Sequence, residues 1–144
     1  MYVTCTPREE FELPVDVAIC PVVGPEVLMG STRMKAGTAQ KLVLNMISTA
    51  TFVRTGKAYE NMMVDLKASS QKLVERSRRT VMTVTGVTYD EAAKAIEASG
   101  RSVKTAIVML ERGCDRAEAE RRLVESNGFV RRAIGGPGEG GATP

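Results

Sequence analysis

The sequence contains no histidine and no tryptophan. Without histidine, the chain cannot by itself form a Ser-His-Asp or Cys-His nucleophilic site, a histidine-ligated zinc site or an imidazole proton shuttle. Any acid–base chemistry within the chain must therefore use carboxylates, lysine, tyrosine or cysteine.

Cysteine is also scarce. Cys5, Cys20 and Cys114 are odd in number and lie far apart along the chain. This pattern is typical of reduced thiols in a cytoplasm rather than of a disulfide framework, and no pair has the spacing of metal ligands. We therefore expect a cytoplasmic protein without a metal site.

Long apolar runs and a strong charge are missing as well. No stretch approaches the roughly eighteen consecutive apolar residues that a membrane span needs, and residues 1–7 lack the basic region and apolar core of a signal peptide. The net charge is only +3, and the densest basic run, residues 76–79, contains no aromatic side chain. Neither a membrane nor a nucleic-acid partner is expected.

What is present indicates an α/β remnant followed by an all-α part, mostly helical overall. With 144 residues, the chain can hold one domain, or part of one with a small companion. The apolar runs at residues 2–5 and 15–20 predict two short strands of the kind found in a parallel sheet that is covered on both faces. Two strands cannot make such a sheet, so the chain begins as though cut into a larger domain.

Helical periodicity dominates the rest. A helix is predicted from about 38 to 55, buried on most sides, and 57–86 predicts connecting helices. Thr88 with Glu91, Ser102 and Asp115 predict the caps of three short helices. Residues 87–134 then predict a small bundle resembling a ubiquitin-associated-like fold, and the glycine-rich 135–144 predict a disordered tail. The expected core of the bundle is Ile96, Val103, Ala106, Ile107, Leu110, Ala119, Leu123, Phe129, Val130 and Ile134.

The segment that indicates chemistry is residues 30–41. It places the hydroxyls of Ser31 and Thr32 and the cations of Arg33 and Lys35 just before a helix. A helix N-terminus attracts anions through its free N–H groups and its dipole, so these residues could bind a phosphate. Equally, the hydroxyls could merely cap the helix while the cations stay in solvent. The glycine spacing matches neither a Walker loop nor a dinucleotide-binding fingerprint.

Several stretches closely resemble the N-acetylmuramic acid 6-phosphate etherases. They are VVGPEV at 22–27, GSTRMKAGTAQKLVLNM at 30–46, MMVDL at 62–66 and KTAIVML at 104–110. The resemblance runs from about residue 1 to about residue 134, and the glucokinase regulatory proteins share the architecture.

The resemblance implies a sugar isomerase (SIS) domain, a doubly wound α/β sandwich that binds phosphosugars. Its C-terminal part would be residues 1–56. It also implies a cytoplasmic, homodimeric lyase of peptidoglycan recycling that uses no cofactor. Such an enzyme cleaves the D-lactyl ether of N-acetylmuramic acid 6-phosphate to N-acetylglucosamine 6-phosphate and D-lactate, by elimination followed by addition of water. In the homodimer, the segment from Ser31 to Lys35 would line the phosphosugar pocket.

The family places its phosphate-binding serine loop and its catalytic glutamates upstream of anything in this chain. No catalytic residue is therefore expected here, and Glu9, Glu10 and Glu12 are interpreted as solvated charges. Glu26 matches a family position beside the site, where a supporting polar contact and a simple turn carboxylate are both open. The substrate-binding residues expected are Glu26, Ser31, Thr32, Arg33 and Lys35.

Two alternatives to a lyase remain. One is a non-catalytic phosphosugar-binding regulatory protein of the glucokinase regulatory protein type. The other is an interaction module in which the helical bundle docks a partner, which rests on analogy of fold alone.

Overall fold

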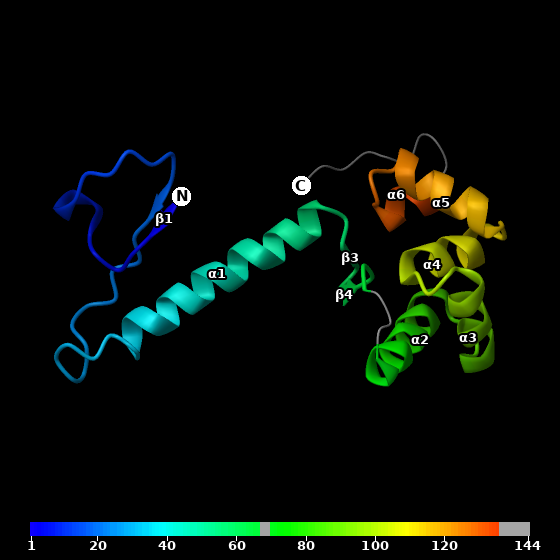
Figure 1. Cartoon of the computed structure of the whole chain (residues 1–144), viewed down its shortest axis with the longest axis horizontal. Helices are drawn as coiled ribbons and strands as arrows, with labels where there is room; N and C mark the ends of the chain where they lie inside the picture. Colours follow the sequence, from blue (N-terminus) through cyan, green and yellow to red (C-terminus); the bar gives the residue numbers. More distant parts are fainter. Residues whose placement is uncertain (67–69, 136–144) are drawn as a thin grey trace. The chain divides into compact units, whose positions relative to one another are not determined.

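The computed structural model describes residues 1–66 and 70–135. These residues are mostly helical, as predicted, and the chain divides into two compact units, Met1–Thr51 and Phe52–Pro144. Figure 1 shows the elements along the chain. The expected disordered tail lies, apart from Gly135, outside the described residues.

The first unit opens with two very short strands. β1 (Tyr2–Val3) and β2 (Ala18–Ile19) pair in parallel, with Tyr2 opposite Ala18 and Val3 opposite Ile19. Between them lies a 3-10 turn, η1 (Arg8–Glu10), and the Tyr2 and Phe11 rings pack edge to face at 5.4 Å. The two predicted strands are confirmed, although each is shorter than its apolar run.

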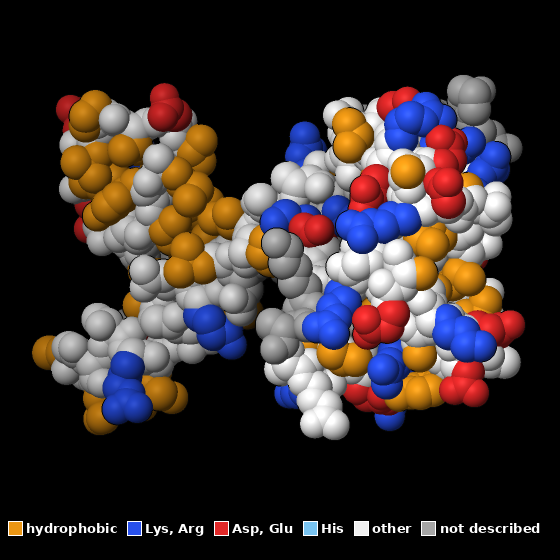
Figure 2. Space-filling model, turned by 45° about the vertical axis from the view of Figure 1, so that its right-hand side comes forward, with side chains coloured by type: hydrophobic (Ala, Val, Ile, Leu, Met, Phe, Trp, Pro, Cys, Tyr) orange, Lys and Arg blue, Asp and Glu red, His pale blue; other side chains and the backbone are white. Residues whose placement is uncertain are grey.

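The long helix α1 (Lys35–Arg54) also belongs mainly to this unit, and it begins three residues before the predicted start. The expectation that it is buried on most sides is wrong, because Val43 is its only buried residue. Leu44 is 49% exposed and Met46 is 62% exposed. The other regular elements described in the first unit are two two-residue strands and one 3-10 turn, which are too small to cover this helix, so most of its apolar side chains are exposed. Figure 2 shows hydrophobic side chains gathered on the surface of this unit.

After the last residues of α1, the second unit contains a hairpin where helix was expected. β3 (Ala58–Tyr59) and β4 (Met62–Met63) pair antiparallel, with Ala58 opposite Met63. Gly56, at φ +69°, ends the preceding helix, and Glu60, at φ +50°, makes the turn between the strands. The prediction of connecting helices is therefore wrong for residues 58–63. A short apolar run cannot be assigned to helix or strand from its periodicity alone.

The rest of the second unit is a helical bundle. Its helices are α2 (Gln71–Thr85), α3 (Tyr89–Ala98), α4 (Val103–Arg112), α5 (Arg116–Glu125) and α6 (Val130–Ile134). The three predicted caps are confirmed. Thr88 and Glu91 form the full capping box of α3, and the side chains of Ser102 and Asp115 accept hydrogen bonds from the first turns of α4 and α5.

The core of this bundle contains most of the predicted residues. Ile96, Val103, Ala106, Ile107, Ala119, Leu123 and Val130 are buried, and Leu110 and Ile134 pack against them while partly exposed. Phe129 is half-buried. Val64, which follows the hairpin, and Val81 of α2 are also in this core, at 1% and 0% exposure. The hairpin and α2 therefore belong to the same packed unit as the three capped helices.

Candidate functional site

The loop between β2 and α1 contains four of the five predicted site residues, and the fifth, Lys35, is the first residue of α1. Gly24 and Gly30 both have positive φ, at +69° and +81°, a left-handed conformation that glycine adopts without steric cost. The turn of residues 28–31, which contains Gly30, is closed by the Ser31 N–H, which donates to the Leu28 carbonyl at 3.0 Å. The loop thus folds back before the helix begins.

Glu26 caps the first turn of α1 from a distance along the chain. Its Oε2 accepts a hydrogen bond from the Lys35 N–H at 3.0 Å, and its Oε1 accepts one from the Ala36 N–H at 3.0 Å. These two bonds, that from Ala36 first, together with the Lys35 charge, lower the pKa of the Glu26 carboxyl below its ordinary value. Because these N–H groups have an acceptor at Glu26, α1 begins at Lys35 rather than near Thr38.

The other N–H groups at the start of α1 also have partners within the chain. The Gly37 N–H donates to the Thr32 carbonyl at 2.8 Å, and the Thr38 N–H donates to the Met34 carbonyl at 3.2 Å. The Lys35 ammonium donates to the Pro25 carbonyl at 2.7 Å. An anion at this end of the helix would therefore be bound by side chains rather than by free backbone amides.

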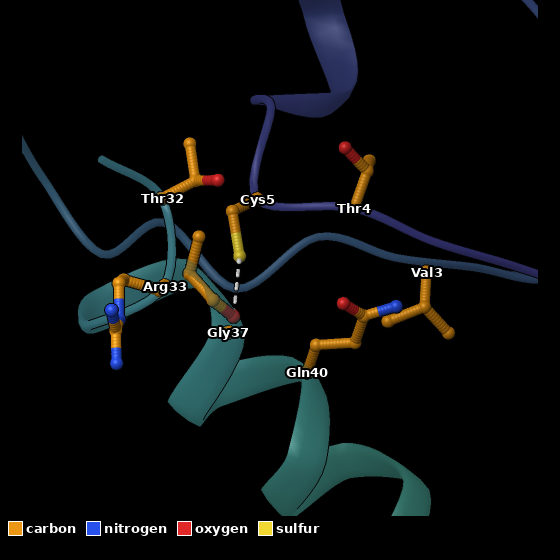
Figure 3. Close-up of a pocket in the computed structure, with 8 residues that line it drawn as sticks. Val3, Thr4, Cys5, Thr32, Arg33, Gly37 and Gln40 are labelled. Atoms are coloured by element: carbon orange, nitrogen blue, oxygen red, sulfur yellow. Dashed lines mark hydrogen bonds between the residues drawn. The ribbon is translucent and has the colours of Figure 1, made fainter. Parts of the chain in front are cut away.

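A pocket of about 380 Å³ lies between the end of β1 and the start of α1. Thr32 and Arg33 line it, whereas Glu26, Ser31 and Lys35 are not among its lining residues. In Figure 3 the Arg33 guanidinium points away from Cys5 and Gln40. The structure thus brings two of the five predicted residues to one pocket and places Glu26 and Lys35 at the base of the loop behind it.

The sequence interpretation missed the residues on the opposite wall. Val3, Thr4 and Cys5 line the pocket at the carboxyl end of β1, and Gln40 does so one turn into α1. The Cys5 thiol donates to the Ala36 carbonyl at 3.7 Å, the contact dashed in Figure 3. The signal that could have found them is the position after a strand of a parallel sheet, because open α/β sheets bind ligands at that edge.

The chemistry of the pocket is that of binding. Its lining offers the hydroxyls of Thr4 and Thr32 and the amide of Gln40, which can donate to an oxyanion. Arg33 adds a guanidinium, which would have to turn from its position in Figure 3 to reach an anion beside Cys5 and Gln40. No carboxylate is among the lining residues. The arrangement can hold a phosphate but lacks a carboxylate acid–base pair.

Among the residues that the structure describes, no three cysteine, aspartate and glutamate side chains lie close enough together to hold a metal ion. None of the described helices combines the length and the apolar composition that crossing a bilayer requires.

Comparison with known proteins confirms the resemblance found in the sequence. No family model matches the chain. Among curated proteins, the chain is 62% identical over 136 residues to a Salinibacter ruber protein named N-acetylmuramic acid 6-phosphate etherase, which covers 94% of this chain and 44% of the relative. Proteins of the same name from Klebsiella aerogenes and Clostridium botulinum (strain Hall) are 52% and 48% identical over 132 residues, again 44% of each relative. The chain spans less than half the length of these curated relatives.

Proposed function

We propose that this chain is the C-terminal part of an N-acetylmuramic acid 6-phosphate etherase. The complete lyase would cleave the D-lactyl ether of its phosphosugar substrate, giving N-acetylglucosamine 6-phosphate and D-lactate. The observation that supports this most strongly is the 62% identity, over 94% of the chain, to a relative of that name. In this proposal the first unit is part of an SIS phosphosugar-binding domain, and the bundle is a ubiquitin-associated-like module.

The pocket of the first unit would contribute to substrate binding. Arg33 and Thr32 would contact the phosphate, and Gln40 and Thr4 would offer further donors to it or to the sugar. In a homodimer, these pocket residues would form one part of the substrate site, and residues that this chain does not contain would form the rest. The enzyme would act in the cytoplasm, in the recycling of peptidoglycan.

The reaction needs an acid and a base that the residues lining this pocket do not supply. Elimination requires a base to remove the sugar's C2 proton and an acid to protonate the ether oxygen as D-lactate leaves, after which water adds to the unsaturated sugar. The lining residues include no carboxylate that could form such a pair. We therefore expect the 144-residue chain to be inactive alone.

The test uses a chimera in which this chain replaces the matched portion of the Salinibacter ruber relative. We expect the purified chimera to release D-lactate from N-acetylmuramic acid 6-phosphate. A folded chimera that binds this phosphosugar but releases no D-lactate would instead favour a regulatory protein that only binds phosphosugars.

A further inference from the structure

We infer that Glu26 is a positioning residue for this pocket: it clamps the loop of residues 26–35 onto α1 and so holds Thr32 and Arg33 at the pocket wall. The inference rests on the proposed function, because it assigns Glu26 a role in binding the same phosphosugar.

Three hydrogen bonds close the loop at its base. The Glu26 carboxylate accepts from the Lys35 and Ala36 N–H groups, both at 3.0 Å, and the Lys35 ammonium donates to the Pro25 carbonyl at 2.7 Å. An ordinary N-cap residue directly precedes its helix, so its side-chain hydrogen bond joins neighbouring residues and restrains no distant segment of the chain. Glu26 lies nine residues before Lys35, so its bonds join two separate segments and fix the path of the chain between them.

Apolar packing cannot hold this loop, because its hydrophobic side chains are exposed. Val27 is 80% exposed, Leu28 is 71% exposed and Met29 is fully exposed. Besides the clamp, the backbone bond from Ser31 to Leu28 makes a local turn within the loop. The polar clamp is therefore the main contact that attaches the first half of the loop to the helix.

The far end of the loop carries the pocket residues. The Thr32 carbonyl accepts from the Gly37 N–H at 2.8 Å, and a Cβ added to Gly37 would lie 3.4 Å from that oxygen. Thr32 and Arg33 thus lie in the last turn of the loop, immediately before α1. Without Glu26, the bond from the Gly37 N–H to the Thr32 carbonyl would still tie this turn to α1. The loop before the turn would be free to shift Thr32 and Arg33, and a binding group displaced by about 1 Å loses much of its effect.

The experiment compares Glu26→Ala and Glu26→Gln in the chimera with Glu12→Ala, which removes an exposed carboxylate elsewhere in the first unit. In the Ala variant we expect the Lys35 and Ala36 amides to exchange with solvent at least about tenfold faster. We also expect KM and Kd for N-acetylmuramic acid 6-phosphate to rise roughly tenfold, while kcat stays within about twofold. Glu26→Gln keeps one acceptor oxygen and should be intermediate, and Glu12→Ala should match the wild type.

If the Lys35 and Ala36 amides exchanged at the same rate in Glu26→Ala as in the wild type, Glu26 would not hold the loop to α1. Faster exchange with unchanged KM and Kd would overturn its positioning role, as would a large fall in kcat at constant KM. If the unsubstituted chimera releases no D-lactate, the proposed function fails separately, and amide exchange and Kd for the same phosphosugar still decide the clamp.

Discussion

The Lys104 ammonium lies 3.4 Å from the Asp65 carboxylate. Lys57 approaches the same carboxylate at 3.6 Å, so Asp65 lies between two cations. The Lys104 side chain is only 13% exposed. Residues 62–66 and 104–110 both belong to the stretches that resemble the etherases, and here they meet in the second unit. Asp65 thus links the segment that follows the hairpin to α4 through Lys104.

We predict that Asp65→Ala lowers the free energy of unfolding by about 1 kcal/mol, because the Lys104 ammonium loses its counter-charge in a largely enclosed position. The matched control is Glu97→Ala, which removes the i,i+4 pair with Arg101, where both side chains are more than half exposed. That pair should contribute only about 0.3–0.5 kcal/mol. Urea unfolding of the two variants measures the difference, and equal losses would contradict the assignment.

Gly56, just before the hairpin, lies close to Gly128, just after α5, and substitution of two glycines tests this contact. Gly56 and Gly86 have nearly the same positive φ, +69° and +72°. A Cβ at Gly56 would lie 2.9 Å from the Gly128 carbonyl oxygen, whereas a Cβ at Gly86 would meet nothing within 4 Å. Gly86→Ala should therefore cost about 1 kcal/mol from backbone strain alone, and Gly56→Ala should cost roughly 1 kcal/mol or more beyond that, since a backbone atom must shift. Thermal unfolding that gave equal losses would contradict the contact.

The parts that the sequence predicted well depend on contacts near in the chain. The capping box of Thr88 and Glu91 spans three residues, and the structure has it as the residues indicate. The hairpin at residues 58–63 was missed because its strands depend on Gly56 and Glu60 in left-handed conformations and on burial of Val64 in a core from distant helices. Tertiary packing decides such short segments, and propensity does not.

The candidate site divides in the same way. Thr32 and Arg33, which line the pocket, could be predicted because they lie in one continuous segment before a helix. Thr4 and Cys5 come from about thirty residues earlier, and only the pairing of β1 with β2 and the approach of α1 make them neighbours of that segment. Glu26 was noticed, but its bonds to the start of α1 span nine and ten residues, a spacing that no local capping pattern describes.

The capping box predicts a pH dependence. Hydrogen bonds from the Thr88 hydroxyl and the Thr88 N–H lower the pKa of Glu91 below its ordinary value of 4.5. A carboxyl with a lowered pKa stabilises the folded state above its unfolded value, and that contribution is lost as the pH falls through the folded value. The stability difference between the wild type and Glu91→Gln should therefore be present at pH 7 and shrink below about pH 4.5. Unfolding across this pH range measures it, and a constant difference would contradict the box.

Arg33 and Lys35 should differ in their effect on binding. Arg33 lines the pocket, and a charge-assisted contact to phosphate is worth about 1.5–3 kcal/mol, so Arg33→Ala should weaken phosphosugar binding by the chimera roughly tenfold to a hundredfold. The Lys35 ammonium is bonded to the Pro25 carbonyl, so Lys35→Ala should act through the loop and weaken binding less. Calorimetric titration compares them, with circular dichroism to check the fold. A larger loss in Lys35→Ala would place the phosphate at Lys35 instead.

The central claim is that this chain supplies part of an etherase, and D-lactate release tests it most directly. The 144-residue chain and the chimera are each incubated with N-acetylmuramic acid 6-phosphate, and D-lactate is measured with a stereospecific dehydrogenase. Our account predicts D-lactate from the chimera and none from the chain alone. D-lactate from the chain alone, or none from a chimera that folds and binds the phosphosugar, would contradict it.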